Sequence, residues 1–209
     1  MSRPRIKICG LTRAEDARLA VTLGADAIGV IFWDRSPRRV SPDQARALCQ
    51  ALPPFVTRVG VFVDASPAEV QAVVDRVGLD AVQLHGDERV EEYEAVGARL
   101  IKVVTVEDEP ALAAATSLPA TVTPLVDAAD RDRRGGTGRL ADWRRAAALA
   151  AVRPSILAGG LTPENVALAV REVMPWAVDV SSGVEDAPGM KSPVKLRAFF
   201  AAIASVEER

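Results

Sequence analysis

Two residues suited to acid–base chemistry close apolar runs that lie far apart in the chain. Cys9 ends the run that starts at Arg5, and Asp127 ends the run that starts at Val122. A carboxylate after an apolar strand must be solvated, paired or functional, because burying it alone is costly. A thiol is a base only when deprotonated, and helix N-termini with an arginine lower its pKa from about 8.5. We therefore hypothesise an acid–base pair, although for Cys9 a packing role stays open.

Glycine-bearing segments indicate an anion site. One contains Gly159-Gly160, and another contains Ser182-Gly183. Glycine lets an anion approach main-chain N–H groups without a Cβ in the way, and a helix N-terminus adds partial positive charge. The amides around Gly159, Gly160, Ser182 and Gly183 are therefore predicted to bind phosphate, with plain tight turns as the alternative.

Further polar candidates follow other strands. Arg38 lies in an arginine-rich loop, where it either clamps a substrate carboxylate or phosphate or forms part of a solvated surface. His85 is the only histidine and is either a substrate-binding residue or a hydrogen-bonded structural one. Asp64 is either a site residue or a helix cap.

These residues require a scaffold of alternating strands and helices. Short β-branched runs predict eight strands, at 5–9, 27–32, 58–63, 81–84, 100–105, 122–127, 155–158 and 177–180. Amphipathic stretches between them predict helices at 14–23, 42–52, 67–77, 143–152 and 163–173. Ser-Pro or Thr-Pro pairs at 41–42, 66–67, 162–163 and 192–193 mark helix starts.

The alternation predicts an α/β fold with a parallel sheet, because the strands are apolar on both faces. A closed (β/α)8 TIM barrel is favoured over an open doubly wound sheet, since closure leaves no edges. No linker divides the chain, so residues 1–209 are expected to form one barrel domain; the glycine-rich segment 135–138 falls between the sixth strand and its helix. In such a barrel the active site lies at the C-terminal ends of the strands.

Composition limits the classes of partner. A formal net charge of -2 offers no broad attraction for nucleic acid. Neither a secretory signal nor a membrane-spanning apolar run is recognised, which favours a cytoplasmic protein that does not bind membranes. The two cysteines, Cys9 and Cys49, lie far apart and only one histidine is present, so we expect free thiols and no zinc site.

In order along the chain, the motifs resemble those of the phosphoribosylanthranilate isomerase family, from residue 5 to about 200. The motifs are Lys7-Ile8-Cys9-Gly10, Gln83-Leu84-His85-Gly86 and Asp179-Val180-Ser181-Ser182-Gly183-Val184-Glu185, with Asp127 before 135–138 and the double glycine at 159–160. The double glycine is shared by many phosphate-binding barrels, whereas the other tags are specific.

The resemblance implies an Amadori rearrangement of N-(5-phosphoribosyl)anthranilate to 1-(2-carboxyphenylamino)-1-deoxyribulose 5-phosphate in tryptophan biosynthesis. It implies Asp127 as general acid, Cys9 as general base, Arg38 on the anthranilate carboxylate and no cofactor or metal. The expected partner is a small phosphorylated molecule, and the chain is expected to be a monomer or a homodimer.

Three other interpretations stay open. A related epimerase barrel would need a metal site, against which the lone histidine argues. An indole-glycerol-phosphate synthase type would need a catalytic lysine with glutamates, and Lys7 and Lys102 have no matching carboxylate set in the sequence. A barrel without activity, kept for binding, is disfavoured by the presence of Cys9, Asp127 and Arg38.

Overall fold

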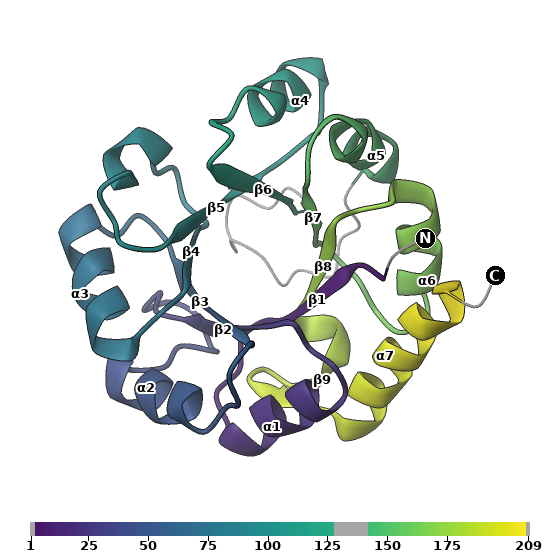
Figure 1. The fold of residues 1–209 in the computed structure, drawn as a ribbon. Helices are drawn as coiled ribbons and strands as arrows, with labels where there is room; N and C mark the ends of the chain where they lie inside the picture. The colour runs from purple at the N-terminus through teal and green to yellow at the C-terminus, as the bar shows by residue number, and fades with distance from the viewer. Residues whose placement is uncertain (1–2, 128–141, 208–209) are drawn as a thin grey trace.

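The computed structural model describes residues 3–127 and 142–207 as a closed barrel of eight parallel strands. Each strand pairs with the next along the chain, and β8 pairs with β1 (Figure 1). The strands are β1 (Arg5–Ile8), β2 (Ala27–Ile31), β3 (Thr57–Phe62), β4 (Ala81–Leu84), β5 (Arg99–Val104), β6 (Val122–Val126), β7 (Ile156–Leu157) and β8 (Ala177–Val180). The barrel and all eight predicted strands are thus confirmed, with ends that shift by one residue at most. The segment 135–138 lies outside the described residues.

Helices cover the outside of the barrel (Figure 1). They are α1 (Ala14–Thr22), α2 (Pro42–Gln50), α3 (Pro67–Val77), α4 (Glu109–Thr116), α5 (Trp143–Val152), α6 (Val166–Val173) and α7 (Pro193–Glu207), with 3-10 turns η1 (Val90–Tyr93) and η2 (Ser182–Val184). A short hairpin, β9 (Glu185–Ala187) and β10 (Met190–Lys191), follows η2. Between β4 and β5 the structure has only η1, and α4 was not predicted because its Ala-rich sequence has little amphipathic pattern.

Serine caps start two of the predicted helices. Ser41 and Ser66 each accept a hydrogen bond from the N3 amide of α2 and α3, and each forms a reciprocal capping box. The prediction that Thr162 and Pro163 start a helix is wrong, because α6 begins only at Val166 and the Thr162 amide donates to Asn165 Oδ1 at 2.8 Å.

The apolar core has two parts that the barrel wall separates. The larger part packs helix residues such as Ala17, Val70 and Val170 against the outer face of the strands. The smaller part fills the barrel itself and consists of Val59, Ala81, Ile101, Leu125, Ile156, Ala158 and Ala177. Since strand side chains alternate between faces, residues two or four positions after these also point inward.

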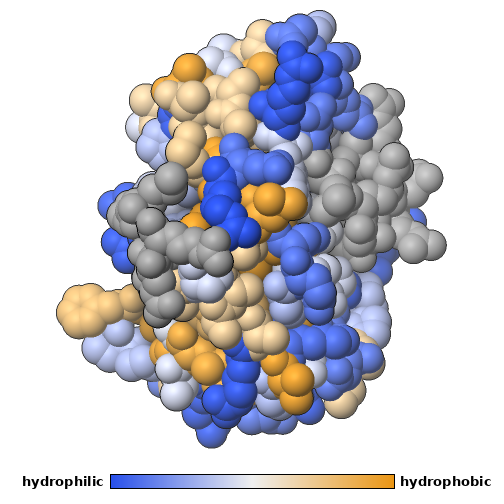
Figure 2. Space-filling view, turned by 90° about the vertical axis from the view of Figure 1, so that its right-hand side faces the viewer, coloured by the Kyte–Doolittle hydropathy of each residue, from blue (hydrophilic) through white to orange (hydrophobic). Residues whose placement is uncertain are grey.

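Polar and apolar residues are interspersed over the outer face of the molecule that Figure 2 shows. Exposed apolar side chains on the helices and the loops beside them include Leu168, Met174, Trp176 and Val194. In the described part of the chain the longest helix, α7, has 15 residues, and none is long and apolar enough to cross a membrane.

The Ser66 cap makes a testable contribution to stability. Ser66→Ala removes the acceptor for the Glu69 amide and the donor to the Glu69 carboxylate. We expect the free energy of unfolding to fall by about 1 kcal/mol in urea denaturation. Ser205→Ala is the control, because that hydroxyl only bonds the Ala202 carbonyl within an exposed helix turn. Equal stability of wild type and Ser66→Ala would show that the cap contributes nothing.

Candidate active site

Strand alternation points a set of polar side chains into the barrel above its apolar filling. Two positions after Leu125 comes Asp127, and four after Ala81 comes His85. On β8 the same step leads from Ala177 to Asp179 and Ser181. On β1 it leads from Lys7, whose Nζ contacts Asp179, to Cys9. β7 and β8 separate β6 from β1 in the ring of strands (Figure 1), so Cys9 and Asp127 follow strands on different sides of the mouth.

Cys9 is anchored and buried just after β1. Its amide donates to Val180 O at 2.8 Å, and its side chain packs over Gly29, where a Cβ would lie 2.8 Å from Sγ. Burial raises the pKa of the Cys9 thiol above its ordinary value, although the positive charge of Lys7 and a hydrogen bond with it act in the opposite direction. The lowered pKa expected from the sequence is therefore wrong for the protein without substrate, because desolvation outweighs the nearby cations.

The floor beneath Cys9 is a buried ion pair. Lys7 Nζ lies 3.0 Å from Asp179 Oδ1, and the two side chains are 4% and 9% exposed. Burial by itself would lower the pKa of Lys7, but the charges and hydrogen bonds of Asp179 and Cys9 raise it overall. Lys7 is therefore an ammonium. The sequence suggested it only as the catalytic lysine of the synthase-type alternative.

Asp127 and His85 meet on the other wall of the barrel. His85 Nε2 lies 3.7 Å from Asp127 Oδ2, and both side chains are 12% exposed. His85 Nδ1 is 3.4 Å from Gln83 Nε2, while the Asp127 amide donates to Val104 O at 3.1 Å. The structure thus brings the histidine and the candidate acid together across β5, a pairing that no sequence pattern predicted.

Arg38 belongs to a buried cluster of charges. Its Nε and Nη2 donate to the Glu185 carboxylate at 2.9 and 2.7 Å, and Lys191 Nζ donates to the same carboxylate at 2.8 Å. The arginine side chain is 12% exposed, so the alternative of a solvated surface is wrong. Gly10, at φ +70, makes room for it, since a Cβ there would lie 2.6 Å from Arg38 Cδ.

Opposing effects set the charge state of this cluster. Burial would raise the pKa of Glu185, but the hydrogen bond from Arg38 and the charge of Lys191 lower it overall. Glu185 therefore stays ionised. For Lys191 burial is the dominant effect and lowers its pKa, with Glu185 acting against it.

The glycine loops after β7 and β8 pack directly on each other. Gly159 and Gly160 both have left-handed backbone, at φ +78 and +64. A Cβ on Gly183 would lie 1.9 Å from the Leu161 carbonyl oxygen, so only glycine fits between the loops. Ser182 opens the turn η2. The four candidate phosphate-binding residues are therefore neighbours in space at the same end of the barrel.

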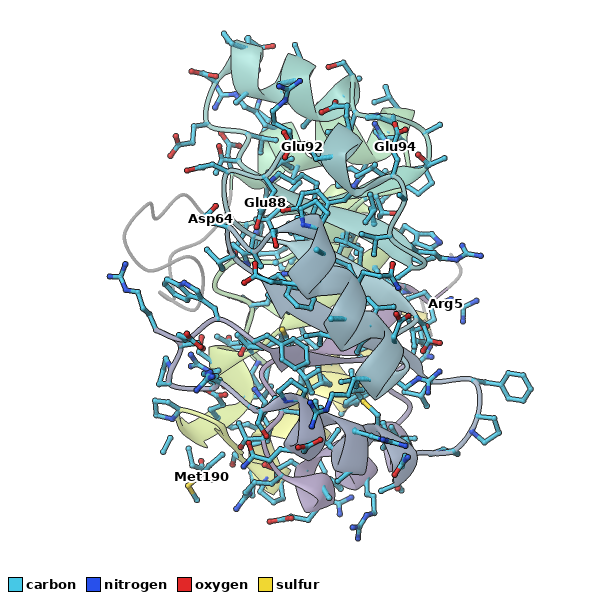
Figure 3. All side chains as sticks on the ribbon, turned by 90° about the vertical axis from the view of Figure 1, so that its left-hand side faces the viewer. Arg5, Asp64, Glu88, Glu92, Glu94 and Met190 are labelled. Carbon is cyan, nitrogen blue, oxygen red and sulfur yellow. The ribbon has the colours of Figure 1, made fainter. Side chains whose placement is uncertain are left out.

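Asp64 has a different role from the two that the sequence suggested. Ser66, not Asp64, caps α3, and Asp64 Oδ1 accepts from the Asp87 amide at 2.8 Å. Glu88 bonds the Asp64 amide at 2.7 Å and Lys102 Nζ at 2.9 Å. Figure 3 shows Asp64 and Glu88 together at one end of the barrel and Arg5 at the other. Asp64 thus joins the loops after β3 and β4.

The functional candidates that sequence reasoning missed are charged residues inside or beside apolar strands. They are Lys7, Asp179, Glu185 and Lys191, each less than 9% exposed. Their signal was present, because a charged side chain within a strand that is buried on both faces needs a partner. The sequence does not identify that partner, since Lys7 and Asp179 are 172 residues apart.

In residues 3–127 and 142–207 no three His, Cys, Asp or Glu side chains are arranged to hold a metal ion. A hollow of about 900 Å³ opens at the opposite end of the barrel, beside Asp80, Arg99 and Thr121. It contains none of the candidate residues, so the mouth at the C-terminal ends of the strands remains the candidate site.

Comparisons with known proteins agree on one family. A family model described as N-(5'-phosphoribosyl)anthranilate (PRA) isomerase matches residues 6–202. An N-(5'-phosphoribosyl)anthranilate isomerase of Nitrosococcus oceani is 48% identical over 207 residues, which cover 98% of this chain and 99% of that protein.

Solved structures give the same result. A phosphoribosyl anthranilate isomerase in complex with reduced 1-(o-carboxyphenylamino)-1-deoxyribulose 5-phosphate matches with a TM-score of 0.86 and 39% identity, over 97% of this chain and 99% of that one. Monomers generated from the dimeric isomerase of Thermotoga maritima match with a TM-score of 0.86 and 37% identity over the same shares.

The Glu185 cluster predicts an acid-sensitive stability. Because the pKa of Glu185 is below its ordinary value of 4.5 in the folded protein, its contribution is complete above that pH and is lost as pH falls through the folded value. Glu185→Gln should therefore unfold more easily than wild type in urea at pH 7, and the difference should shrink towards pH 3.

Asp186→Asn is the matched control. Its carboxylate lies next in the chain but is 60% exposed and 3.6 Å from Lys195 Nζ, so it should change stability by less than about 1 kcal/mol. A stability difference between Glu185→Gln and wild type that is constant from pH 7 to pH 3 would contradict the assignment.

Proposed function

The chain belongs to the N-(5'-phosphoribosyl)anthranilate isomerase family, and from that premise we propose that Cys9 and Asp127 perform the proton transfers of its reaction. The enzyme is an aldose–ketose isomerase of tryptophan biosynthesis. The observation that carries the proposal is that a thiol and a carboxylate take inward positions at the mouth-side ends of β1 and β6, two strands that β7 and β8 separate, at the same end of the barrel as the paired glycine loops.

Asp127 acts first, as general acid. It protonates the furanose ring oxygen, and the C1'–O bond breaks while the nitrogen lone pair forms a C1'=N bond. The result is an open-chain Schiff base. His85, 3.7 Å from Asp127 Oδ2, supports this step by orienting the carboxyl group and by contacting the substrate.

Cys9 then acts as general base. After the Cys9 thiol has released its own proton to solvent, the thiolate removes the C2' proton. The electrons of the C–H bond form the C1'=C2' bond of an enolamine as the C1'=N bond becomes single. Transfer of a proton from the C2' hydroxyl to C1' gives the ketone. Substrate and product are isomers, so no oxidant or reductant is consumed, and these steps use only proton transfers to and from side chains, solvent and the substrate itself.

Charged and main-chain groups hold the two ends of the substrate. Arg38 binds the anthranilate carboxylate. The Nε and Nη2 groups of Arg38 donate hydrogen bonds to Glu185, whereas its Nη1 has no hydrogen bond to any described residue. The amides around Gly159, Gly160, Ser182 and Gly183 bind the phosphate, which the left-handed glycine backbone and the absence of Cβ atoms support.

The wider setting follows from the same features. We propose that residues 1–209 work as one barrel domain, in the cytoplasm, where reducing conditions keep Cys9 and Cys49 as thiols. The partner is the phosphorylated substrate and not nucleic acid. The chain acts as a monomer or a homodimer; the related Thermotoga maritima isomerase is described as dimeric.

The proton-transfer roles predict the loss of turnover in two variants. Cys9→Ala removes the base and Asp127→Asn keeps the shape of the acid without its proton. Each should reduce kcat by at least about 10²-fold, the lower range for a positioned acid or base. The assay follows the loss of fluorescence of enzymatically generated phosphoribosylanthranilate.

Cys49→Ala is the control, because that thiol is buried in α2 away from the mouth. All three variants should retain the circular dichroism of wild type. Full turnover by a folded Cys9→Ala or Asp127→Asn enzyme would remove the assigned role.

The carboxylate clamp predicts a binding defect. Arg38→Lys keeps the charge but loses the planar fork that contacts Glu185 and the substrate together, so KM should rise about tenfold while kcat changes less. The neighbouring Arg39→Lys is the control, since Arg39 is 53% exposed and pairs with Asp34. An unchanged KM in Arg38→Lys would place the carboxylate elsewhere.

A further inference from the structure

Lys7 is a buried cation for which the reaction steps above provide no use. It lies on β1, two residues before Cys9, and its side chain is 4% exposed. Burying an ammonium costs several kcal/mol, which its partner offsets only when the geometry is good. An apolar pair of the same volume would fill the barrel equally well. Stability alone therefore gives little reason for a charge at this position.

We propose that Lys7 is a positioning residue for Cys9: its ammonium, fixed by Asp179, orients the sulfur towards the substrate and stabilises the thiolate that takes the C2' proton. This inference rests on the proposed function of Cys9 as general base. Lys7 itself neither gains nor loses a proton in the reaction.

The packing around Gly29 places the two side chains together. A Cβ at Gly29 on β2 would lie 2.8 Å from Cys9 Sγ and 3.2 Å from Lys7 Cε. Both side chains therefore occupy the space that this glycine leaves open. An ammonium has three donors, and Asp179 Oδ1 at 3.0 Å accepts one of them. The positive charge of Lys7 also acts on the Cys9 thiol beside it, in the direction that lowers the pKa of the thiol.

The other charges around Cys9 are less suited to this role. Lys191, on β10, also acts to lower the pKa of the Cys9 thiol, but its effect is smaller than that of Lys7. Its Nζ already donates a hydrogen bond to Glu185 at 2.8 Å. Arg38, after β2, is likewise bonded to Glu185. Asp179 disfavours the thiolate, and Asp127 and His85 face the mouth from β6 and β4. Lys7 is thus the cation with the largest effect on the thiol, and its side chain lies beside the sulfur at Gly29.

Asp179 limits the effect of Lys7 as well as fixing it. Its negative charge opposes the thiolate, so the thiol stays protonated in the protein without substrate, where burial raises its pKa. The thiol must release its own proton to solvent before it can take the C2' proton. Lys7 reduces the free-energy cost of that ionisation, because its charge favours the sulfur anion without moving. Such preorganised charge avoids the reorganisation that water would require.

The test measures the thiolate directly and does not depend on turnover. In a Cys49→Ala background, which leaves Cys9 as the only thiol, the rate of alkylation by iodoacetamide is followed from pH 6 to pH 11. Lys7→Met should move the midpoint of this profile up by about one pH unit or more, and should lower the rate at a fixed pH by about tenfold. The limb of the kcat/KM profile that reports the base should move in the same direction.

Two further variants separate the thiolate effect from damage to the fold. Lys7→Met with Asp179→Asn removes both charges, so no unpaired carboxylate stays buried. Because Asp179 opposes the thiolate, the double variant should show a smaller rise of the alkylation midpoint than Lys7→Met. Lys102→Met is the matched control, because it breaks a lysine–glutamate pair, 2.9 Å long, on the outside of the same barrel. It should leave the alkylation profile of Cys9 unchanged.

Each outcome decides the proposal. An unchanged midpoint in a folded Lys7→Met enzyme would overturn it, as would the same shift in Lys102→Met. Failure of both Lys7 variants to fold would also overturn it, by showing a structural role instead. If Cys9→Ala is active, the role of Cys9 as base fails separately, whatever the alkylation profile shows.

Discussion

The pairing of β1 with β8 closes the barrel, and the candidate site depends on that closure. Its register sets Lys7 opposite Asp179 and Ile8 opposite Val180, so the first and last strands share one polar layer. The Cys9 amide continues the ladder by donating to Val180 O. Closure also provides the ion pair with a low-exposure environment, because a sheet without edges surrounds it on all sides. Without this register the thiol would have neither its cation nor its fixed position.

Along the barrel axis, the apolar residues that stabilise the fold are separate from the charged residues of the proposed site. Apolar side chains fill its lower part, whereas the upper part holds charges that are paired with one another. Lys7 is matched by Asp179, and Glu185 is shared by Arg38 and Lys191. Pairing lets these groups stay ionised while they are withdrawn from water, which strengthens their action on a bound substrate. The same pairs hold the loops after β2 and β8 at fixed positions around the mouth.

Two lysines that suggested a synthase-type reaction have other uses in this structure. Lys7 points inward but is bound to Asp179 beneath the thiol. Lys102 contacts Glu88 and the Gly86 carbonyl, and so supports the loop after β4. Membership of the isomerase family and these contacts agree, because both lysines already have partners.

The sequence by itself determined the periodic and local features of this protein. Alternating apolar runs predicted eight strands and a parallel barrel, and Ser-Pro pairs predicted the starts of α2 and α3, because each signal lies within a few neighbouring residues. Its ordered motifs also pointed to the isomerase family. Only the tertiary structure decided which distant residues meet: Lys7 with Asp179, Arg38 with Glu185, and His85 with Asp127. It also decided that burial raises the pKa of Cys9. Contacts and desolvation depend on strand register and packing density, and those exist only once the barrel has closed.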